Sequence, residues 1–263
     1  QIEALRKVRR ERSDAAVAGI IRLLRATVRL RESPHFEIVP APGDLGRFDS
    51  VPEFIRDLKL HGYYGGMRLI KACIKRFHDH CQQHSIPIDL SRNFTVSFES
   101  DIPRLVGLAG SSAIVTAMMR ALMRFYDVAI PHSILPTLDL SVEKDELGIS
   151  AGLQDRVIQV YEGIVYMDFD RDYLEQNGHG LYEEVRPPRL PPIYIAYDPR
   201  RAEVSDVPHR NLRDLFSRGD QQVVDAMKSF RQLTDQGRAA LMAGDWTELG
   251  RVMDANFDLR TTI

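Results

Sequence analysis

Cysteine is scarce in this sequence, and Cys73 and Cys81 are the only two among 263 residues. They lie eight positions apart in a stretch of helical periodicity, which separates them by about 12 Å along a helix, too far for a disulfide bond. His78, His80 and His84 are spread around the same polar helix end and form no zinc-binding pattern with the cysteines. We therefore expect a cytoplasmic protein with reduced thiols.

Net charge and long apolar runs are also lacking. The 35 basic and 37 acidic side chains leave a formal charge of −2, so no general attraction to nucleic acid or anionic membranes is expected. No run approaches the ~20 apolar residues that span a bilayer. Residues 1–12 are basic but lack the apolar core of a signal peptide, and a solvated helix face explains them better than a nucleic-acid arm. The sequence thus predicts neither a nucleic-acid partner nor a membrane partner.

What is present is an ordinary globular composition, 44% hydrophobic and 27% charged, long enough for one large domain or two modest ones. Alternating apolar residues predict strands, and apolar residues at helical spacing predict helices. The expected strands are 26–30, 36–38, 94–98, 164–169 and 193–197. The expected helices are 1–22, 67–77, 112–126, 133–147, 208–217, 220–243 and 245–260, and residues 157–161 are expected to form a short helix or a turn. This order of elements favours an α+β fold, with a domain boundary near residue 187.

A glycine-rich loop lies between strand 94–98 and the helix expected to start near Ser112. Its residues are Gly107, Leu108, Ala109, Gly110, Ser111, Ser112 and Ala113. The glycines permit close backbone approach, and the free N–H groups at the start of a helix favour an anion such as a phosphate. The Ser112 hydroxyl suits Mg²⁺ at this point. The plainer alternative is a glycine turn with a serine N-cap. No lysine follows the second glycine, so this is not a Walker loop.

Residues 103–113, which read Pro-x-x-x-Gly-Leu-x-x-Ser-Ser-Ala, resemble the second motif of the GHMP kinases, a family of small-molecule kinases. Glu143 and Asp155 resemble that family's metal-binding glutamate and catalytic aspartate at the usual separation, and residues 163–168 resemble the strand that follows. The resemblance covers residues 24–263. Within the family it is a resemblance to the glucuronokinases, carried by residues 62–69, 107–115, 151–157 and 256–260.

The resemblance implies a two-domain GHMP-kinase-like fold. Residues 1–187 are expected to hold a mixed sheet with helices, and residues 188–263 a largely helical C-terminal domain. It also implies transfer of a phosphoryl group from ATP, with Mg²⁺, to a small sugar or uronic acid. Glucuronate is the expected acceptor, and glucuronate 1-phosphate the product. Two alternatives stay open: another sugar kinase activity, such as phosphorylation of a heptose phosphate, and a nucleotide- or sugar-binding protein without catalysis.

Roles for individual residues follow from the same resemblance. The ATP phosphates are expected along residues 107–113, and Mg²⁺ on Ser112 and Glu143. Asp155 is expected beside the attacking hydroxyl, where it orients that group or accepts its proton. From the residues alone, a solvated helix residue explains Glu143 better than a metal ligand does, and the alternative for Asp155 is a helix N-cap.

Three further residues are candidates for contacts with the acceptor. A uronate carboxylate calls for a cation, and Arg156 and Arg68 lie in segments that carry the resemblance. Tyr64 is a candidate to hold the sugar or to line the adenine pocket. Solvated or structural roles are the alternatives for the arginines, and core packing for the tyrosine.

Two motifs of the family are not found in this chain. Residues 1–22 show no sign of its first motif, a substrate loop, and the chain ends at Ile263 before the third, a glycine-rich loop. We therefore expect the C-terminal domain to be incomplete.

Overall fold

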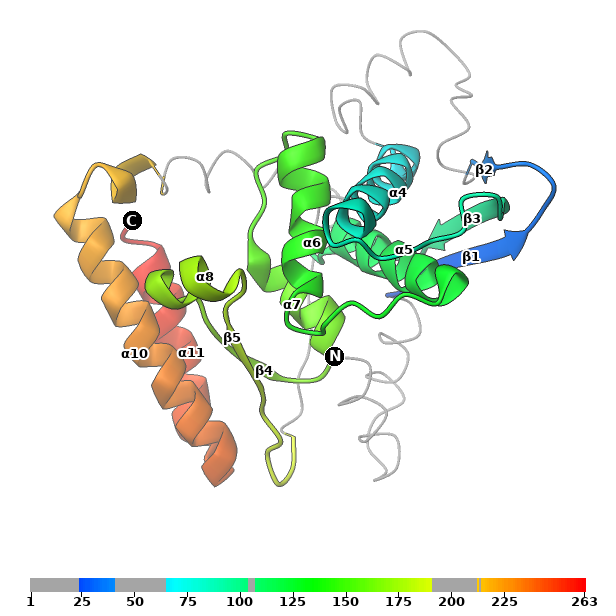
Figure 1. Cartoon of the computed structure of the whole chain (residues 1–263). Coiled ribbons are helices and arrows are strands. Elements are labelled where there is room, and N and C mark those ends of the chain that lie inside the picture. Colours follow the sequence, from blue (N-terminus) through cyan, green and yellow to red (C-terminus); the bar gives the residue numbers. More distant parts are fainter. Residues whose placement is uncertain (1–23, 41–64, 104–106, 191–211, 213) are drawn as a thin grey trace, which may run out of the picture.

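The computed structural model describes residues 24–40, 65–103, 107–190, 212 and 214–263 (Figure 1). The helix expected at 1–22 and the strand expected at 193–197 lie outside the described residues. Of the helix expected at 208–217, residues 208–211 and 213 also lie outside them.

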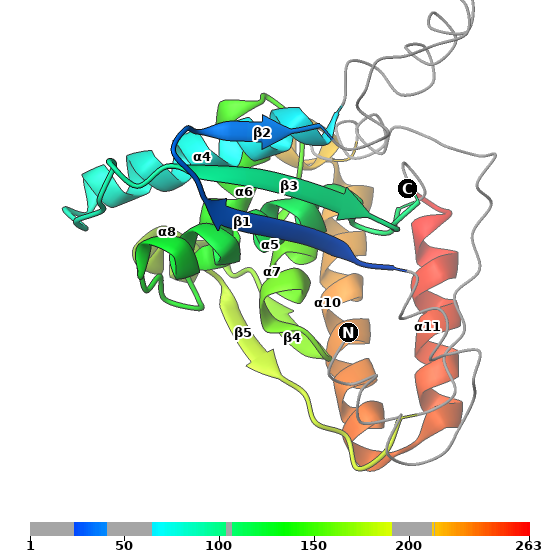
Figure 2. The ribbon, with the colours of Figure 1, turned by 90° about the vertical axis from the view of Figure 1, so that its right-hand side faces the viewer.

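A three-stranded mixed sheet forms one face of the N-terminal part. Strand β1 (Ala26–Glu32) pairs antiparallel with β3 (Phe94–Ser100), and β2 (Glu37–Val39) pairs parallel with the other edge of β3. Alternate side chains of β3, including Val96 and Phe98, are buried on one face. Figure 2 shows the sheet lying across two helices that cover this face. The alternating pattern in the sequence therefore predicted these strands.

The two covering helices are α4 (Gly66–Gln83) and α5 (Gly110–Tyr126). Both carry apolar residues at helical spacing, and these residues meet under the sheet to form the core. Burial of each large side chain contributes about 1.5–3 kcal/mol. The most fully buried members include Ile70, Cys73, Phe77, Val115, Met118, Met119 and Leu122.

Close packing fixes the start of α4 against the sheet. A Cβ atom added at Gly66 would lie 2.1 Å from a ring atom of Phe98, far inside van der Waals contact. Only glycine fits here while the ring keeps its place. The β3–α4 contact therefore depends on this residue.

The region after α5 is more broken than the sequence predicted. The helix expected at 133–147 is a short helix, α6 (Leu135–Ser141), continued by a π-helical turn, η2 (Val142–Glu146). Helix α7 (Leu153–Tyr161) begins four residues before its expected start, and strand β4 (Val165–Asp168) follows.

Two elements were not predicted. Helix α8 (Arg171–Asn177) and strand β5 (Leu181–Glu184) follow β4, and β5 pairs antiparallel with it.

The last described residues form a helical hairpin of α10 (Gln221–Ala243) and α11 (Trp246–Arg260), close to the expected bounds. Gly244 ends α10 in the left-handed conformation, and the Asp245 side chain caps α11. The hairpin meets the β4–β5 pair through polar contacts, including a 2.7 Å hydrogen bond from Tyr166 to Asp235. The α+β class and the mixed sheet are confirmed, while the boundary near residue 187 stays a prediction.

Both cysteines are free, as expected, and both are buried. Within the described ranges, the helices are too short or too polar to cross a bilayer.

Candidate functional site

The glycine-rich loop turns sharply into α5. Gly107 and Ala109 both have positive φ, 75° and 54°, and Ala109 is the N-cap of the helix. The predicted helix start near Ser112 is wrong by two residues, because this turn lets Gly110 begin the helix. The serine N-cap alternative is wrong for the same reason. The first helical bond runs from the Ala113 N–H to the Ala109 carbonyl at 3.0 Å, so the preceding N–H groups have no partner inside the helix.

Ser112 places an unused hydroxyl beneath this first turn. The residue is completely buried, and its Oγ makes no hydrogen bond within the described part of the chain. A buried hydroxyl without a partner costs about 1–3 kcal/mol, so such groups call for an explanation. An oxygen held at the start of a helix, beside free N–H groups, is suited to a metal ion that accompanies a bound phosphate.

One helical turn further along α5, Thr116 donates a 2.6 Å hydrogen bond to Oδ2 of Asp139 on α6. Asp139 is completely buried, and burial raises the pKa of its carboxyl to about 7, against the opposing effects of Thr116 and the Arg156 charge. Sequence reasoning missed Asp139. The available signal was a single acidic residue between Leu138 and Leu140 in an otherwise apolar helix.

Glu143 and Arg156 form a buried ion pair between η2 and α7. Glu143 Oε2 contacts Arg156 Nη2, and both residues are almost fully buried. Burial lowers the pKa of the Arg156 guanidinium to about 10, although the Asp139 charge opposes the shift. The alternative of a solvated Glu143 is therefore wrong. Its carboxylate lies in the π-helical turn, a distortion frequent at functional sites.

Asp155 differs from Glu143 in being open to solvent. It lies in the first turn of α7, and its side chain is 53% exposed. Its Oδ2 is 3.6 Å from Arg156 Nη1. The N-cap alternative is wrong, because Gly152 holds that position. An external hydroxyl can thus reach Asp155.

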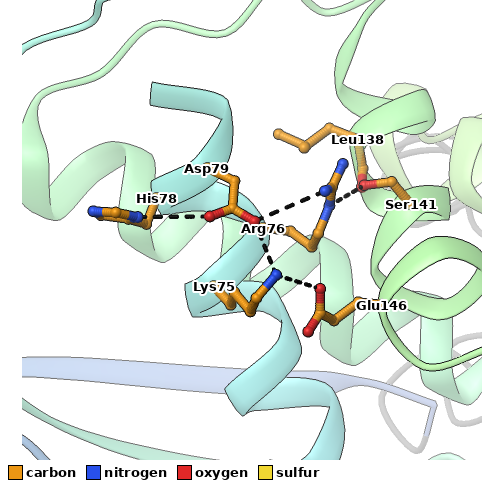
Figure 3. Close-up of polar contacts among 7 residues, drawn as sticks. All are labelled: Lys75, Arg76, His78, Asp79, Leu138, Ser141 and Glu146. Atoms are coloured by element: carbon orange, nitrogen blue, oxygen red, sulfur yellow. Dashed lines mark hydrogen bonds and ion pairs between the residues drawn. The ribbon is translucent and has the colours of Figure 1, made fainter. Parts of the chain in front are cut away.

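A second polar network joins α4 to η2 (Figure 3). Lys75 pairs with Glu146 at 2.7 Å and with Asp79 at 3.0 Å. Nearby, Arg76 Nε donates a 3.0 Å hydrogen bond to Ser141 Oγ. The ion pair between Lys75 and Glu146 therefore attaches the end of η2, the turn that carries Glu143, to α4.

The other predicted residues lie elsewhere. Arg68 is exposed on the first turn of α4. Tyr64 lies outside the described residues. The structure therefore links Glu143 and Asp155 through Arg156. It also links Asp139 to Thr116 of α5, one helical turn from Ser112.

The residues present fit a magnesium ion. Ser112 and Glu143 supply a hydroxyl and a carboxylate, which are hard oxygen ligands, and each lies one helical turn, about 6 Å, from the Thr116–Asp139 contact. In the described parts of the chain, no group of three or more His, Cys, Asp or Glu residues forms a metal cage. A magnesium ion commonly uses few protein ligands and completes its shell with phosphate oxygens and water, so two such residues suffice for it.

Comparisons with known proteins find similar sequences and structures. Residues 68–163 match the GHMP kinases N terminal domain. Glucuronokinase 1 of Arabidopsis thaliana is 40% identical over 238 residues, which make up 89% of this chain. The chain spans 65% of that relative's length.

Solved structures show the same fold at low identity. L. major mevalonate kinase in complex with R-mevalonate matches with a TM-score of 0.57 and 17% identity, over 90% of this chain and 66% of that one. Streptococcus pneumoniae phosphomevalonate kinase in complex with phosphomevalonate and AMPPNP matches with 0.58 and 16%, over 88% and 69%. These two similarities concern the fold alone.

Proposed function

The chain belongs to the GHMP kinase family, and we propose that it is an ATP-dependent sugar kinase that phosphorylates glucuronate to glucuronate 1-phosphate. The observation that carries this proposal is the 40% identity to a glucuronokinase over 89% of the chain. The buried oxygen of Ser112 beneath the first turn of α5 supports a kinase reaction independently of that identity.

We assign the ATP phosphates to the N-terminal turn of α5. The N–H groups of Gly110, Ser111 and Ser112 point out of the helix start and donate to phosphate oxygens. The left-handed turn at Gly107 and Ala109 lets the backbone approach the anion closely. Phosphoryl transfer depends on alignment and charge neutralisation more than on covalent help, so a rigid cradle of this kind is the main requirement.

Ser112 and Glu143 are the residues that would hold Mg²⁺ beside those phosphates. When bound, the ion neutralises the charge that develops on the transferred phosphoryl group. Asp155, open to solvent and near the same guanidinium as Glu143, orients the attacking sugar hydroxyl or accepts its proton.

The acceptor's carboxylate requires a cation or N–H donors. Of the two candidate arginines, only Arg68 is exposed, whereas the Arg156 guanidinium faces Glu143. We therefore place the carboxylate toward Arg68, with Tyr64 as a further candidate. The two-domain division near residue 187 remains part of the proposal.

A coupled assay of ADP release tests the function. The purified protein is given ATP, Mg²⁺ and one acceptor at a time: glucuronate, galacturonate, glucose or a heptose phosphate. Acceptor-dependent turnover with glucuronate, and a sugar 1-phosphate in the phosphorus NMR spectrum, are the expected results. Turnover with a heptose phosphate alone would favour the alternative kinase. Nucleotide binding without turnover on any acceptor would favour a binding protein.

A further inference from the structure

We propose that Arg156 is a positioning residue, which holds the Glu143 and Asp155 carboxylates at a fixed separation and does not bind the substrate's carboxylate. The inference rests on the proposed function, because it concerns how the metal and acceptor residues of that reaction are arranged.

The geometry of one guanidinium carries this proposal. Arg156 Nη2 contacts Oε2 of Glu143, while Nη1 lies 3.6 Å from Oδ2 of Asp155 and donates a 3.0 Å hydrogen bond to the Gly152 carbonyl. The same planar group therefore touches a residue of η2, the N-cap of α7 and the first turn of α7. Since Asp155 is the adjacent residue in the chain, the place of its carboxylate relative to Glu143 is set through this bridge.

Burial separates a positioning role from a recognition role. The Arg156 side chain is only 4% exposed, whereas that of Asp155 is 53% exposed. A substrate can reach the aspartate without reaching the guanidinium. A buried ion pair contributes little net stability, because desolvation of the two charges offsets their attraction. Its presence here is better explained by the geometry it imposes.

The chemistry of arginine suits this bridge. A rigid planar fork directs two N–H groups to different acceptors at defined angles, which the single ammonium of lysine does not do. One of these N–H groups contacts Oε2 of Glu143, the carboxylate proposed to hold the metal ion. Residues that hold a metal ligand in this way typically change metal affinity by about 10–100-fold when they are removed.

The test measures nucleotide binding as well as turnover. ADP is titrated calorimetrically into the wild-type protein, Arg156→Lys and Arg156→Gln, once with Mg²⁺ and once with EDTA. We expect Mg²⁺ to tighten ADP binding to the wild type, and both variants to lose about 10-fold or more of that tightening. Binding in EDTA should stay unchanged, which also shows that the variants are folded.

Arg120→Lys is the matched control. Arg120 donates to the Glu162 carboxylate and to the Val160 carbonyl at the other end of α7, so the same type of interaction is altered without touching Glu143 or Asp155. This variant should keep the Mg²⁺ effect.

Turnover on glucuronate and a double variant complete the test. Arg156→Lys should lower kcat while KM for glucuronate changes less than about threefold, because a positioning residue does not touch the acceptor. In a Glu143→Gln background, Arg156→Gln should have no further effect on the Mg²⁺ dependence of ADP binding.

Three outcomes would overturn the inference: a raised KM for glucuronate with an intact Mg²⁺ effect, tighter binding of ADP with Mg²⁺ in the variants, or additive effects in the double variant. If the wild type itself shows no Mg²⁺-dependent ADP binding, the proposed function fails first, and the inference falls with it.

Discussion

Thr116 on α5 donates a 2.6 Å hydrogen bond to the buried carboxyl of Asp139 on α6. This contact joins the helix whose first turn we assign to the phosphates with the helix that leads into η2 and Glu143. Thr116 lies one helical turn after Ser112, and Asp139 lies one helical turn before Glu143. Ser112 and Glu143 are the residues assigned to the metal ion. The hydrogen bond therefore connects the two helices that carry the two halves of the proposed site.

Asp155→Asn should lower kcat by about 10²–10⁴-fold and leave KM for ATP nearly unchanged. Asparagine keeps the size of the side chain but cannot take a proton, and the ATP phosphates are assigned to a different element. Because the side chain is 53% exposed, the free energy of unfolding should change by less than about 0.5 kcal/mol. Steady-state kinetics and the melting temperature of the same sample show whether the change affects the reaction or the stability of the protein. A near-normal kcat would rule out a role in proton transfer or alignment.

Ser112→Ala should separate stability from activity. Without bound nucleotide, removal of a buried hydroxyl that has no partner in the described chain should leave the melting temperature unchanged or raise it. Turnover at limiting Mg²⁺ should fall, because one oxygen ligand is lost. Ser111→Ala, next to it in the first turn, is the control for the helix itself. Lower stability of Ser112→Ala without ligand would mean that the hydroxyl has an internal role.

Asp139→Asn should change how stability depends on pH. The pKa of this carboxyl is raised from 3.8 to about 7 in the folded protein, so between these values the folded state holds a proton that the unfolded state has lost. The stability that this proton contributes is full below about pH 4 and is lost as the pH rises to about 7. Asparagine should remove that part of the decline.

Melting temperatures of the wild type and Asp139→Asn at pH 5 and pH 8 measure this effect. The variant should lose less stability between the two values than the wild type does. The exposed Asp254→Asn change on α11 is the control and should follow the wild type. Parallel curves for Asp139→Asn and the wild type would show that Asp139 does not titrate in this range.

Gly66→Ala should destabilise the protein by about 1–3 kcal/mol, because the new methyl group meets the Phe98 ring. Gly250→Ala on α11 is the matched control, since its Cβ would meet nothing within 4 Å. Because alanine is favoured over glycine in the interior of a helix, this change should raise the free energy of unfolding by up to about 1 kcal/mol. Denaturant unfolding of both variants measures the difference, and equal stabilities would show that the ring moves aside freely.

Sequence reasoning reached the strands, the longer helices and the glycine-rich loop, because each has a strong local pattern. The loop at Gly107 and the alternation of β3 needed no information from distant residues. The start of α5 was predicted too late because Ala109 adopts a left-handed conformation, which an alanine in the sequence does not predict.

What sequence reasoning missed depends on partners far along the chain. Strand β5 exists because β4 is present to pair with it, and its own exposed, mixed residues give no clear alternation. Helix α8 was missed because it is short, although Asp170 and Gly178 at its ends are residues typical of helix caps. The significance of Asp139 and of the Glu143–Arg156 pair appears only when three helical elements are packed together.

The attachment of the α10–α11 hairpin has a consequence for how the protein opens. Its described contacts with β4 and β5 include the exposed pairs Arg231–Asp168 and Arg238–Glu183, which salt screens. The core under the mixed sheet is apolar and is not weakened in this way. The hairpin is therefore expected to behave as a separate cooperative unit, whose amide protons exchange sooner than those of α5 and whose release becomes easier as ionic strength rises.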